Sequence, residues 1–369
     1  MNVTRQICYS LTVTLLIALF LEVITRTVWS PPNWADALDV GTQLIPHPTR
    51  IWALEPGTHT QFGVEVSIDE NGLRTGLNDT SEPSWLVLGD SSFFGHGLAD
   101  TDTLHTQLST QLNQIGIERG VRCAGVPGYS ILQSRILLDE LGWDLNPEIL
   151  VIGNLWSDNN IDHFVDAKWL DALHKPTAQL ISTFRRSHLF LWLWAQLRPA
   201  GFEGRKGDPQ AKISWLRDPN ASGQRRVAVE DYASALDQVL AEAGRRGVGV
   251  VLIQPANVYR VDQSVDEATW DPYFFAMAEV GRHRDVPVLD AAAYFRAFGL
   301  SSQNGFIDEL HPSGLGNQYI AQGVLLQLQA SGWPAERPIP NQKPPIKQTW
   351  QDPWADGVDF EANTGGGTP

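Results

Sequence analysis

Short apolar runs alternate with amphipathic segments over most of the chain. The runs are too short for helices, and apolar residues at helical spacing follow them. Continuous apolar strands between amphipathic helices are typical of a parallel sheet that is covered on both faces. We therefore predict a three-layer α/β/α sandwich with a five-stranded parallel sheet. The predicted strands are Trp85–Leu88, Val121–Ala124, Ile149–Ile152, Val248–Ile253 and Val286–Leu289. The predicted helices lie around residues 104–115, 132–141, 232–243, 272–280 and 320–328.

Three stretches do not follow this alternation. Residues 29–83 are rich in Pro, Gly, Thr and Asn, which indicates an irregular N-terminal extension with one hairpin and a turn at Asn71–Arg74. Residues 159–228 form a helical insertion around the apolar run Phe190–Trp194, and this insertion either packs on the core or serves as a lid or interaction surface. Residues 333–369 are rich in proline and acidic residues, which is typical of a disordered tail. Residues 84–332 remain as the predicted folded domain.

The N-terminus differs from the rest of the chain. Residues 7–23 are almost all apolar, and spanning a bilayer takes about 20 such residues. No typical cleavage site follows, so we interpret residues 1–28 as an uncleaved transmembrane signal-anchor in preference to a cleaved signal peptide. Arg5 precedes the apolar run and favours a cytoplasmic N-terminus. We then expect the folded domain to face the periplasm or the cell exterior.

Composition excludes some functions. The net charge of the 369 residues is −15, which argues against binding to nucleic acid or to anionic membrane surfaces. Fourteen tryptophans are compatible with sugar binding and equally with core packing. Cys8 and Cys123 are not expected to form a disulfide. The sequence has no CxxC, HExxH or Walker lysine, and we expect neither a metal nor a cofactor.

Two short motifs carry the chemistry. The sequence GDSS places Ser91 just past the first predicted strand, and DELHP places Asp308 three residues before His311. A serine hydroxyl needs a base to take its proton and a third group to hold that base, and these side chains supply both. Ser91 at a helix start could also donate its amide to an oxyanion. Simpler interpretations are a helix N-cap for Ser91 and a turn histidine for His311.

These motifs resemble signatures of the SGNH (GDSL-type) hydrolase superfamily, in its bacterial, membrane-anchored branch. The first block is Leu88–Gly97, the second is Ala124–Ser130, and the last is Asp308–Pro312. The resemblance covers roughly residues 85–328 and implies a sheet of flavodoxin-like order. It also implies a Ser91–His311–Asp308 triad and an amide of Gly128 in the oxyanion hole.

The third block departs from the family pattern. The family places glycine-x-asparagine-aspartate after the third strand, and the asparagine donates to the oxyanion. Here the chain reads GNLWSDNN over residues 153–160, so Ser157 stands where the asparagine belongs and Asp158 matches the aspartate. Asn154 and Asn159 are rival donors, and we favour Ser157 over Asn154.

Other titratable side chains lie nearby in the sequence. Asp158, Asp162 and Asp166, with His163, recur at helical spacing and could bind a hard cation, although a solvated acidic face is the usual explanation. His96 is expected to line the pocket, and His105 is expected at the surface.

Together these observations predict a serine esterase. It would remove acyl groups, such as O-acetyl, from an ester-bearing small molecule or an envelope polysaccharide through an acyl-enzyme. If a sugar hydroxyl replaces water, the same residues make a polysaccharide O-acetyltransferase. A non-catalytic carbohydrate- or partner-binding protein of the same fold is the alternative from another class.

Overall fold

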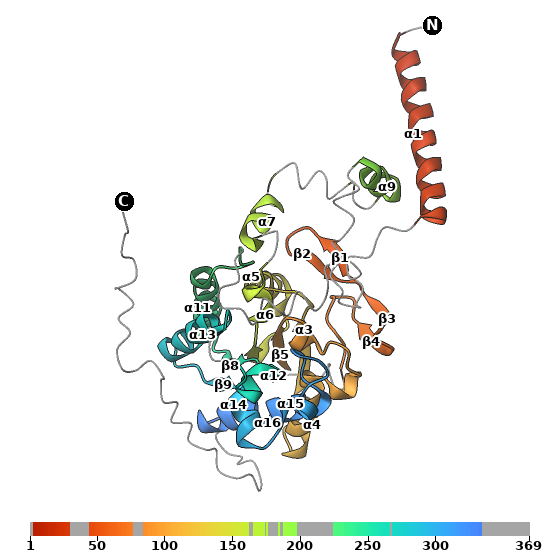
Figure 1. Cartoon of the computed structure of the whole chain (residues 1–369). Coiled ribbons are helices and arrows are strands. Elements are labelled where there is room, and N and C mark those ends of the chain that lie inside the picture. Colours follow the sequence, from red (N-terminus) through yellow and green to blue (C-terminus); the bar gives the residue numbers. More distant parts are fainter. Residues whose placement is uncertain are drawn as a thin grey trace, which may run out of the picture.

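A computed structural model describes residues 3–29, 44–76, 84–161, 165–173, 175, 184, 187–197, 224–265 and 268–333. Figure 1 shows a sheet with helices on both faces and one long helix that projects from this body. The predicted tail lies outside the described residues apart from Trp333, and so does much of the predicted insertion.

Five parallel strands form the central sheet, as predicted. They are β5 (Ser84–Gly89), β6 (Gly120–Gly125), β7 (Pro147–Ile152), β8 (Gly249–Gln254) and β9 (Val288–Asp290). Their spatial order is β6-β5-β7-β8-β9, which is the flavodoxin-like order. The last strand begins later than predicted. Pro287 has no N–H for the ladder, although its carbonyl still accepts from the Leu252 amide.

Helices cover both faces, and alternate strand residues point into the two layers. Leu86 and Leu88 join one core cluster, and Trp85 and Val87 join the other. The first layer contains α5 (Ile131–Leu137), α11 (Val229–Arg246) and α13 (Asp271–His283). The second contains α4 (Leu104–Gln114), α14 (Ala291–Ala297) and α16 (Gly314–Ala330). The shorter helices are α3 (Ser91–Phe94), η1 (Asp100–Asp102), η2 (Leu138–Gly142), α6 (Trp156–Asn159), α7 (Asp166–Leu173), α12 (Val258–Asp262) and α15 (Ser302–Gly305).

The N-terminal extension is more regular than the sequence indicated. Strands β1 (Leu44–His47) and β2 (Ile51–Leu54) form one antiparallel hairpin, and β3 (Gly57–Gln61) and β4 (Val64–Ile68) form a second. The strands are too short for their alternation to stand out from the Pro- and Gly-rich background. Even so, Leu44, Trp52 and Val66 are buried in the same core cluster as α5, so the hairpins belong to the domain core.

The turn at Asn71–Arg74 forms as predicted. Gly72 has a φ of +77°, and its amide donates to the carbonyl of Asp69. After the turn, the backbone of Arg74 forms an antiparallel bridge with Cys123 on the edge strand β6. The extension is thereby joined to the sheet.

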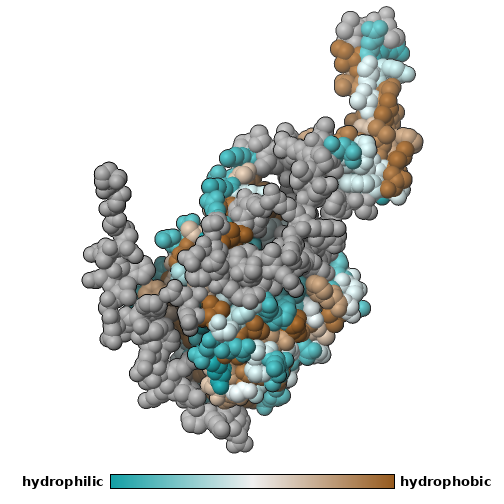
Figure 2. Space-filling model, in the orientation of Figure 1, coloured by the Kyte–Doolittle hydropathy of each residue, from teal (hydrophilic) through white to brown (hydrophobic). Residues whose placement is uncertain are grey.

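Helix α1 (Val3–Val28) projects from the body in Figure 1, and apolar side chains run along it in Figure 2. Among the described residues, one helix is long and apolar enough to cross a membrane, over Arg5–Val28 with a mean hydropathy of 2.3. Helix α9 (His188–Leu197) contains the predicted apolar run of the insertion and packs beside α1.

Candidate active site

The structure brings the three predicted catalytic side chains together. Ser91 is the first residue of α3, directly after β5, and Asp308 and His311 lie on the loop between α15 and α16. His311 Nε2 lies 2.8 Å from Ser91 Oγ, and His311 Nδ1 lies 2.7 Å from Asp308 Oδ2. The three groups form one continuous hydrogen-bonded chain that ends on the serine hydroxyl.

The Asp308 carboxylate organises its own loop. Its Oδ1 accepts the amides of Leu310 and His311 at 2.8 and 2.7 Å, which leaves Oδ2 for the imidazole. Partial burial raises the pKa of Asp308, but hydrogen bonds and charge from His311 outweigh burial and hold this pKa well below its usual range. Asp308 is therefore ionised at neutral pH and favours the imidazole tautomer with its proton on Nδ1.

The turn that presents Ser91 is fixed by Asp90 and by packing. Buried Asp90 caps α3 by accepting the amide of Ser92 at 3.1 Å, and it also accepts the amide of Ser157 at 3.3 Å. Burial raises the pKa of Asp90, against these hydrogen bonds. A Cβ on Gly89 or Gly153 would overlap the ring of Phe93, so both glycines are needed for this ring to pack under the turn.

The two backbone amides that the motifs single out are those of Ser91 and Gly128. Within the described part of the chain, no acceptor binds the amide of Ser91 or of Gly128. Gly128 has a φ of +78°, which favours glycine. Arg226 donates to the Gly128 carbonyl at 2.7 Å, and the Trp52 indole donates to the Pro127 carbonyl at 3.1 Å. These two contacts fix the direction in which the Gly128 amide points.

The structure distinguishes among the candidate oxyanion donors of the third block. Asn154 is fully buried, and its amide group donates to Ser134 Oγ at 2.9 Å and to the Tyr129 carbonyl at 3.3 Å. Asn159 is also fully buried and donates to Thr269 Oγ1 at 3.1 Å. Ser157 is 9% exposed, and its hydroxyl has no hydrogen-bond partner among the described residues. Both asparagine side chains thus form hydrogen bonds within the core, whereas no described residue binds the Ser157 hydroxyl.

The acidic group after the third strand is not a solvated helical face. Asp158 and Asp166 are fully buried, and the helix is interrupted between α6 and α7. Asp166 forms an ion pair with Arg226 at 2.7 Å, and Asp158 accepts the Ile131 amide at 2.8 Å. Burial raises the pKa of Asp158 well above its ordinary value. The other members of the proposed cation site, Asp162 and His163, lie outside the described residues.

His96 stacks on the imidazole of His311. Its ring centroid lies 4.3 Å from that of His311 with an interplanar angle of 27°, and Phe62 packs edge-on against His96 at 4.7 Å. Buried Gln61 lies 3.3 Å from His96 Nδ1 and also accepts the Gly97 amide. Burial, and then the charge of His311, lower the pKa of His96 to about 3, so His96 stays neutral.

Two further findings concern the histidines. The prediction of a surface position for His105 is wrong, because His105 is fully buried on α4 and burial lowers its pKa to about 3. Donor atoms of His96, Asp308 and His311 lie within 4.8 Å of one another, close enough to hold a metal ion. However, Asp308 and His311 already bind each other, which accounts for their proximity without an ion.

Arginines outside the motifs also support the site, and sequence reasoning missed them. Arg74 is buried, and it donates to the carbonyls of Phe94, Gly95 and Leu98 as well as to the carboxylate of Asp100. It thus anchors the end of α3. Arg74 follows the predicted turn, but no local pattern marks an arginine as buried when its partners lie 20 or more residues away.

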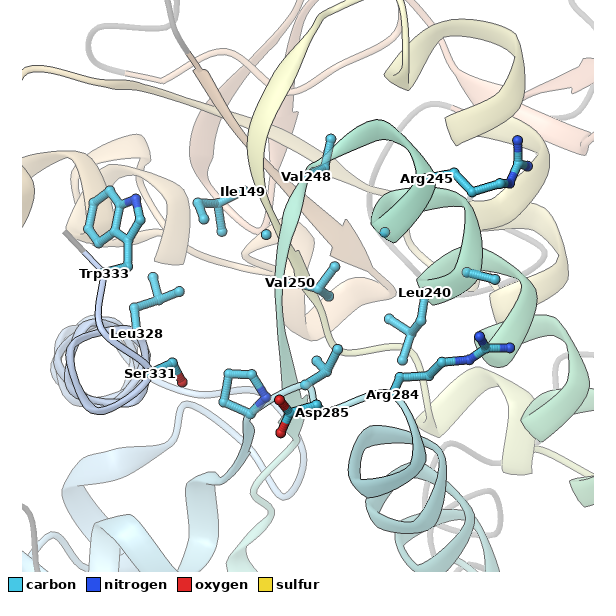
Figure 3. A pocket seen from close by; sticks show the side chains of 15 residues that line it. Ile149, Leu240, Arg245, Val248, Val250, Arg284, Asp285, Leu328, Ser331 and Trp333 are labelled. Atoms are coloured by element: carbon cyan, nitrogen blue, oxygen red, sulfur yellow. The ribbon is translucent and has the colours of Figure 1, made fainter. Parts of the chain in front are cut away.

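The cleft in Figure 3 lies away from these residues. It measures roughly 630 Å³ and is lined by side chains such as Ile149, Val248 and Val286, near the amino ends of β7, β8 and β9. Ser91 follows the carboxyl end of β5, where ligands bind in open parallel sheets. The cleft is therefore separate from the candidate active site.

No protein-family model and no curated protein matches the chain. Among solved structures, it is similar to the lipase/acylhydrolase of Enterococcus faecalis (16% identity, TM-score 0.43, covering 67% of this chain and 96% of that one). It is also similar to the acetylxylan esterase Axe2 of Geobacillus stearothermophilus (15%, 0.44, 68% and 96%). A third similar structure is LAE5, an α/β hydrolase from the metagenome of Lake Arreo in Spain (17%, 0.43, 70% and 98%). Identity at this level is too low to carry a substrate from those proteins to this one.

Proposed function

We propose that this chain is an SGNH-type serine hydrolase that acts on carboxylic esters. The observation that carries the proposal is the hydrogen-bonded chain from Asp308 through His311 to Ser91 Oγ. The three blocks that resemble the family supply this chain and the two available amides. Nothing in this arrangement calls for a cofactor.

The proposed reaction follows from these positions. His311 Nε2 takes the proton of Ser91 as Oγ attacks the acyl carbonyl, and Asp308 stabilises the imidazolium that forms. The amides of Ser91 and Gly128 donate to the oxyanion, and Ser157 Oγ serves as the third donor. Protonated His311 then gives its proton to the leaving alcohol. Water, activated by the same imidazole, releases the acyl group from Ser91.

We further propose that α1 anchors the domain outside the cytoplasmic membrane. Its length and apolar composition support a span, although a cleaved signal sequence would share them. Glu22 on α1 accepts hydrogen bonds from the start of α9, which supports an α1 that is not cleaved. In this position an O-acylated envelope polysaccharide is the proposed substrate.

The neighbouring serines of GDSS offer a matched test. Ser91→Ala should abolish hydrolysis of p-nitrophenyl acetate by the purified chain, because it removes the attacking oxygen. Ser92→Ala should retain hydrolysis, because Ser92 Oγ is buried and has no hydrogen-bond partner among the described residues. A fluorophosphonate probe should label Ser91 in the wild-type protein and in Ser92→Ala.

Equal rates for wild type and Ser91→Ala, with no fluorophosphonate label on Ser91, would contradict the proposed reaction. The protein would then be a binding protein that keeps the fold. Circular dichroism of both variants excludes unfolding as the cause of any loss.

A further inference from the structure

The N-terminus of α9 is fixed to α1 by a single carboxylate. Glu22 of α1 accepts hydrogen bonds from Ser187 Oγ at 2.6 Å and from the amides of His188 and Leu189, each at 3.0 Å. A carboxylate at a helix N-terminus satisfies unpaired amides and is favoured by the helix dipole. The ring of Trp29 packs edge-on against His188. Helix α9 is therefore held at the end of α1 that is nearest to the domain.

The composition of α9 is unusual for a surface helix. Its sequence HLFLWLWAQL contains no Asp, Glu, Lys or Arg. Trp192 and Leu193 are 38% and 46% exposed, and Phe184 just before the helix is exposed as well. In the sequence, Arg185 and Arg186 precede α9 and Arg198 follows it. Exposed aromatic residues beside the end of an apolar span are typical of a membrane interface, where aromatic rings sit at the level of the lipid headgroups.

The orientation of the two helices agrees with this composition. In Figure 1, α1 is seen along its length, whereas α9 is seen end-on beside the base of α1, so the two helices cross. If α1 runs along the bilayer normal, α9 lies along the bilayer plane. Glu22 and Trp29 lie toward the C-terminal end of α1, where an apolar span gives way to the polar interface.

We propose that α9 is an interfacial helix, which lies in the lipid headgroup region of the membrane that α1 spans. The lipid bilayer would cover Phe184, Trp192 and Leu193. This inference rests on the membrane anchorage proposed above. Together, α1 and α9 would attach the domain at two points and restrict its rotation over the membrane.

Depth-dependent quenching in nanodiscs tests the proposal on the full chain. A Cys8→Ser background removes the exposed native thiol, and Cys123 is buried. A nitrobenzoxadiazole fluorophore is attached at Leu193→Cys on α9. Matched labels are placed at Leu16→Cys on α1 and at Leu315→Cys on α16, both exposed positions. The nanodiscs contain phosphatidylcholine and phosphatidylglycerol, with or without nitroxide-labelled lipid.

We expect nitroxide lipid to quench the labels at positions 16 and 193 by about half or more, and to leave position 315 unchanged. Quenching at position 16 without quenching at 193 overturns the interfacial helix but preserves the anchor. Absence of quenching at both positions overturns the anchor and, with it, the placement of α9. Equal quenching at 193 and 315 points to nonspecific adsorption and also contradicts the proposal.

Discussion

The candidate oxyanion donors of the third block differ in whether their side chains already form hydrogen bonds within the protein. Asn154 and Asn159 both direct their side chains into the protein, and their amides already have acceptors. The Ser157 backbone amide donates to Asp90, and its hydroxyl has no hydrogen-bond partner in the part of the chain that the structure describes. A sequence alignment by residue type alone would select an asparagine, because asparagine is the donor in the family. Matching Asp158 to the family's aspartate selects Ser157 instead.

We predict that Ser157→Ala lowers kcat on the order of 10²-fold, because loss of one oxyanion donor raises the transition state more than the bound substrate. KM and the thermal midpoint should change little. Asn154→Ala should instead destabilise the fold by about 1–3 kcal/mol, since it leaves buried polar groups unpaired. Steady-state kinetics and urea unfolding of both variants check this. A folded Asn154→Ala protein with low kcat, beside an unaffected Ser157→Ala protein, would mean that the alignment is wrong.

The candidate site residues could be named from the sequence because short motifs contain them. Ser91, Gly128, Asp308 and His311 each follow a strand or precede a helix within a few residues of the chain. The residues that hold them could not be predicted. Arg226, for example, meets Asp166 and Gly128 across 60 and 98 residues, and such pairing leaves no periodic pattern in a single sequence.

At the scale of elements, the hairpins are the part that the sequence pattern described least well. Strands of four or five residues are too short for an alternating pattern to be distinguished from a loop. Their long-range contacts are nevertheless extensive. The side chain of Trp52 forms a hydrogen bond with the second block, that of Gln61 with His96, and that of Arg74 with the end of α3.

We predict that Arg74→Ala lowers the free energy of unfolding by about 3–5 kcal/mol, because it leaves buried carbonyls unpaired and removes the partner of Asp100. The matched control is Arg119→Ala. Its ion pair with Glu148 at 2.7 Å is half-buried at the surface, so its loss should cost about 1 kcal/mol or less. Urea unfolding monitored by tryptophan fluorescence measures both variants. Similar losses in the two proteins would refute a structural role for Arg74 in the core.

For the whole molecule, buried neutral histidines couple stability to pH. Burial, and then the charge of Arg74, lower the pKa of His105 from 6.5 to about 3. His47 and His96 are also lowered, to about 4 and about 3. Below pH 6.5 these histidines become protonated in the unfolded chain, whereas they stay neutral in the folded protein. Stability therefore falls as the pH drops from about 6.5 toward 3.

We predict that His105→Gln reduces the stability difference between pH 7 and pH 5 by about 2 kcal/mol, since one titrating group is removed from the unfolded chain. Ser109→Ala, a change at another buried position on α4, should leave that difference unchanged even if it lowers stability at both pH values. Urea midpoints at the two pH values provide the comparison. An unchanged difference in His105→Gln would show that His105 is protonated in the folded protein.

The turn around Gly128 depends on both segments that lie outside the βα alternation. Trp52 comes from the N-terminal extension, Arg226 comes from the end of the insertion, and each contacts this turn. A chimera that transplants only the sandwich into another protein would keep Ser91 and lose the two contacts that support the Gly128 amide. Substitutions at Trp52 should therefore be tolerated only with compensating changes around residues 127–129.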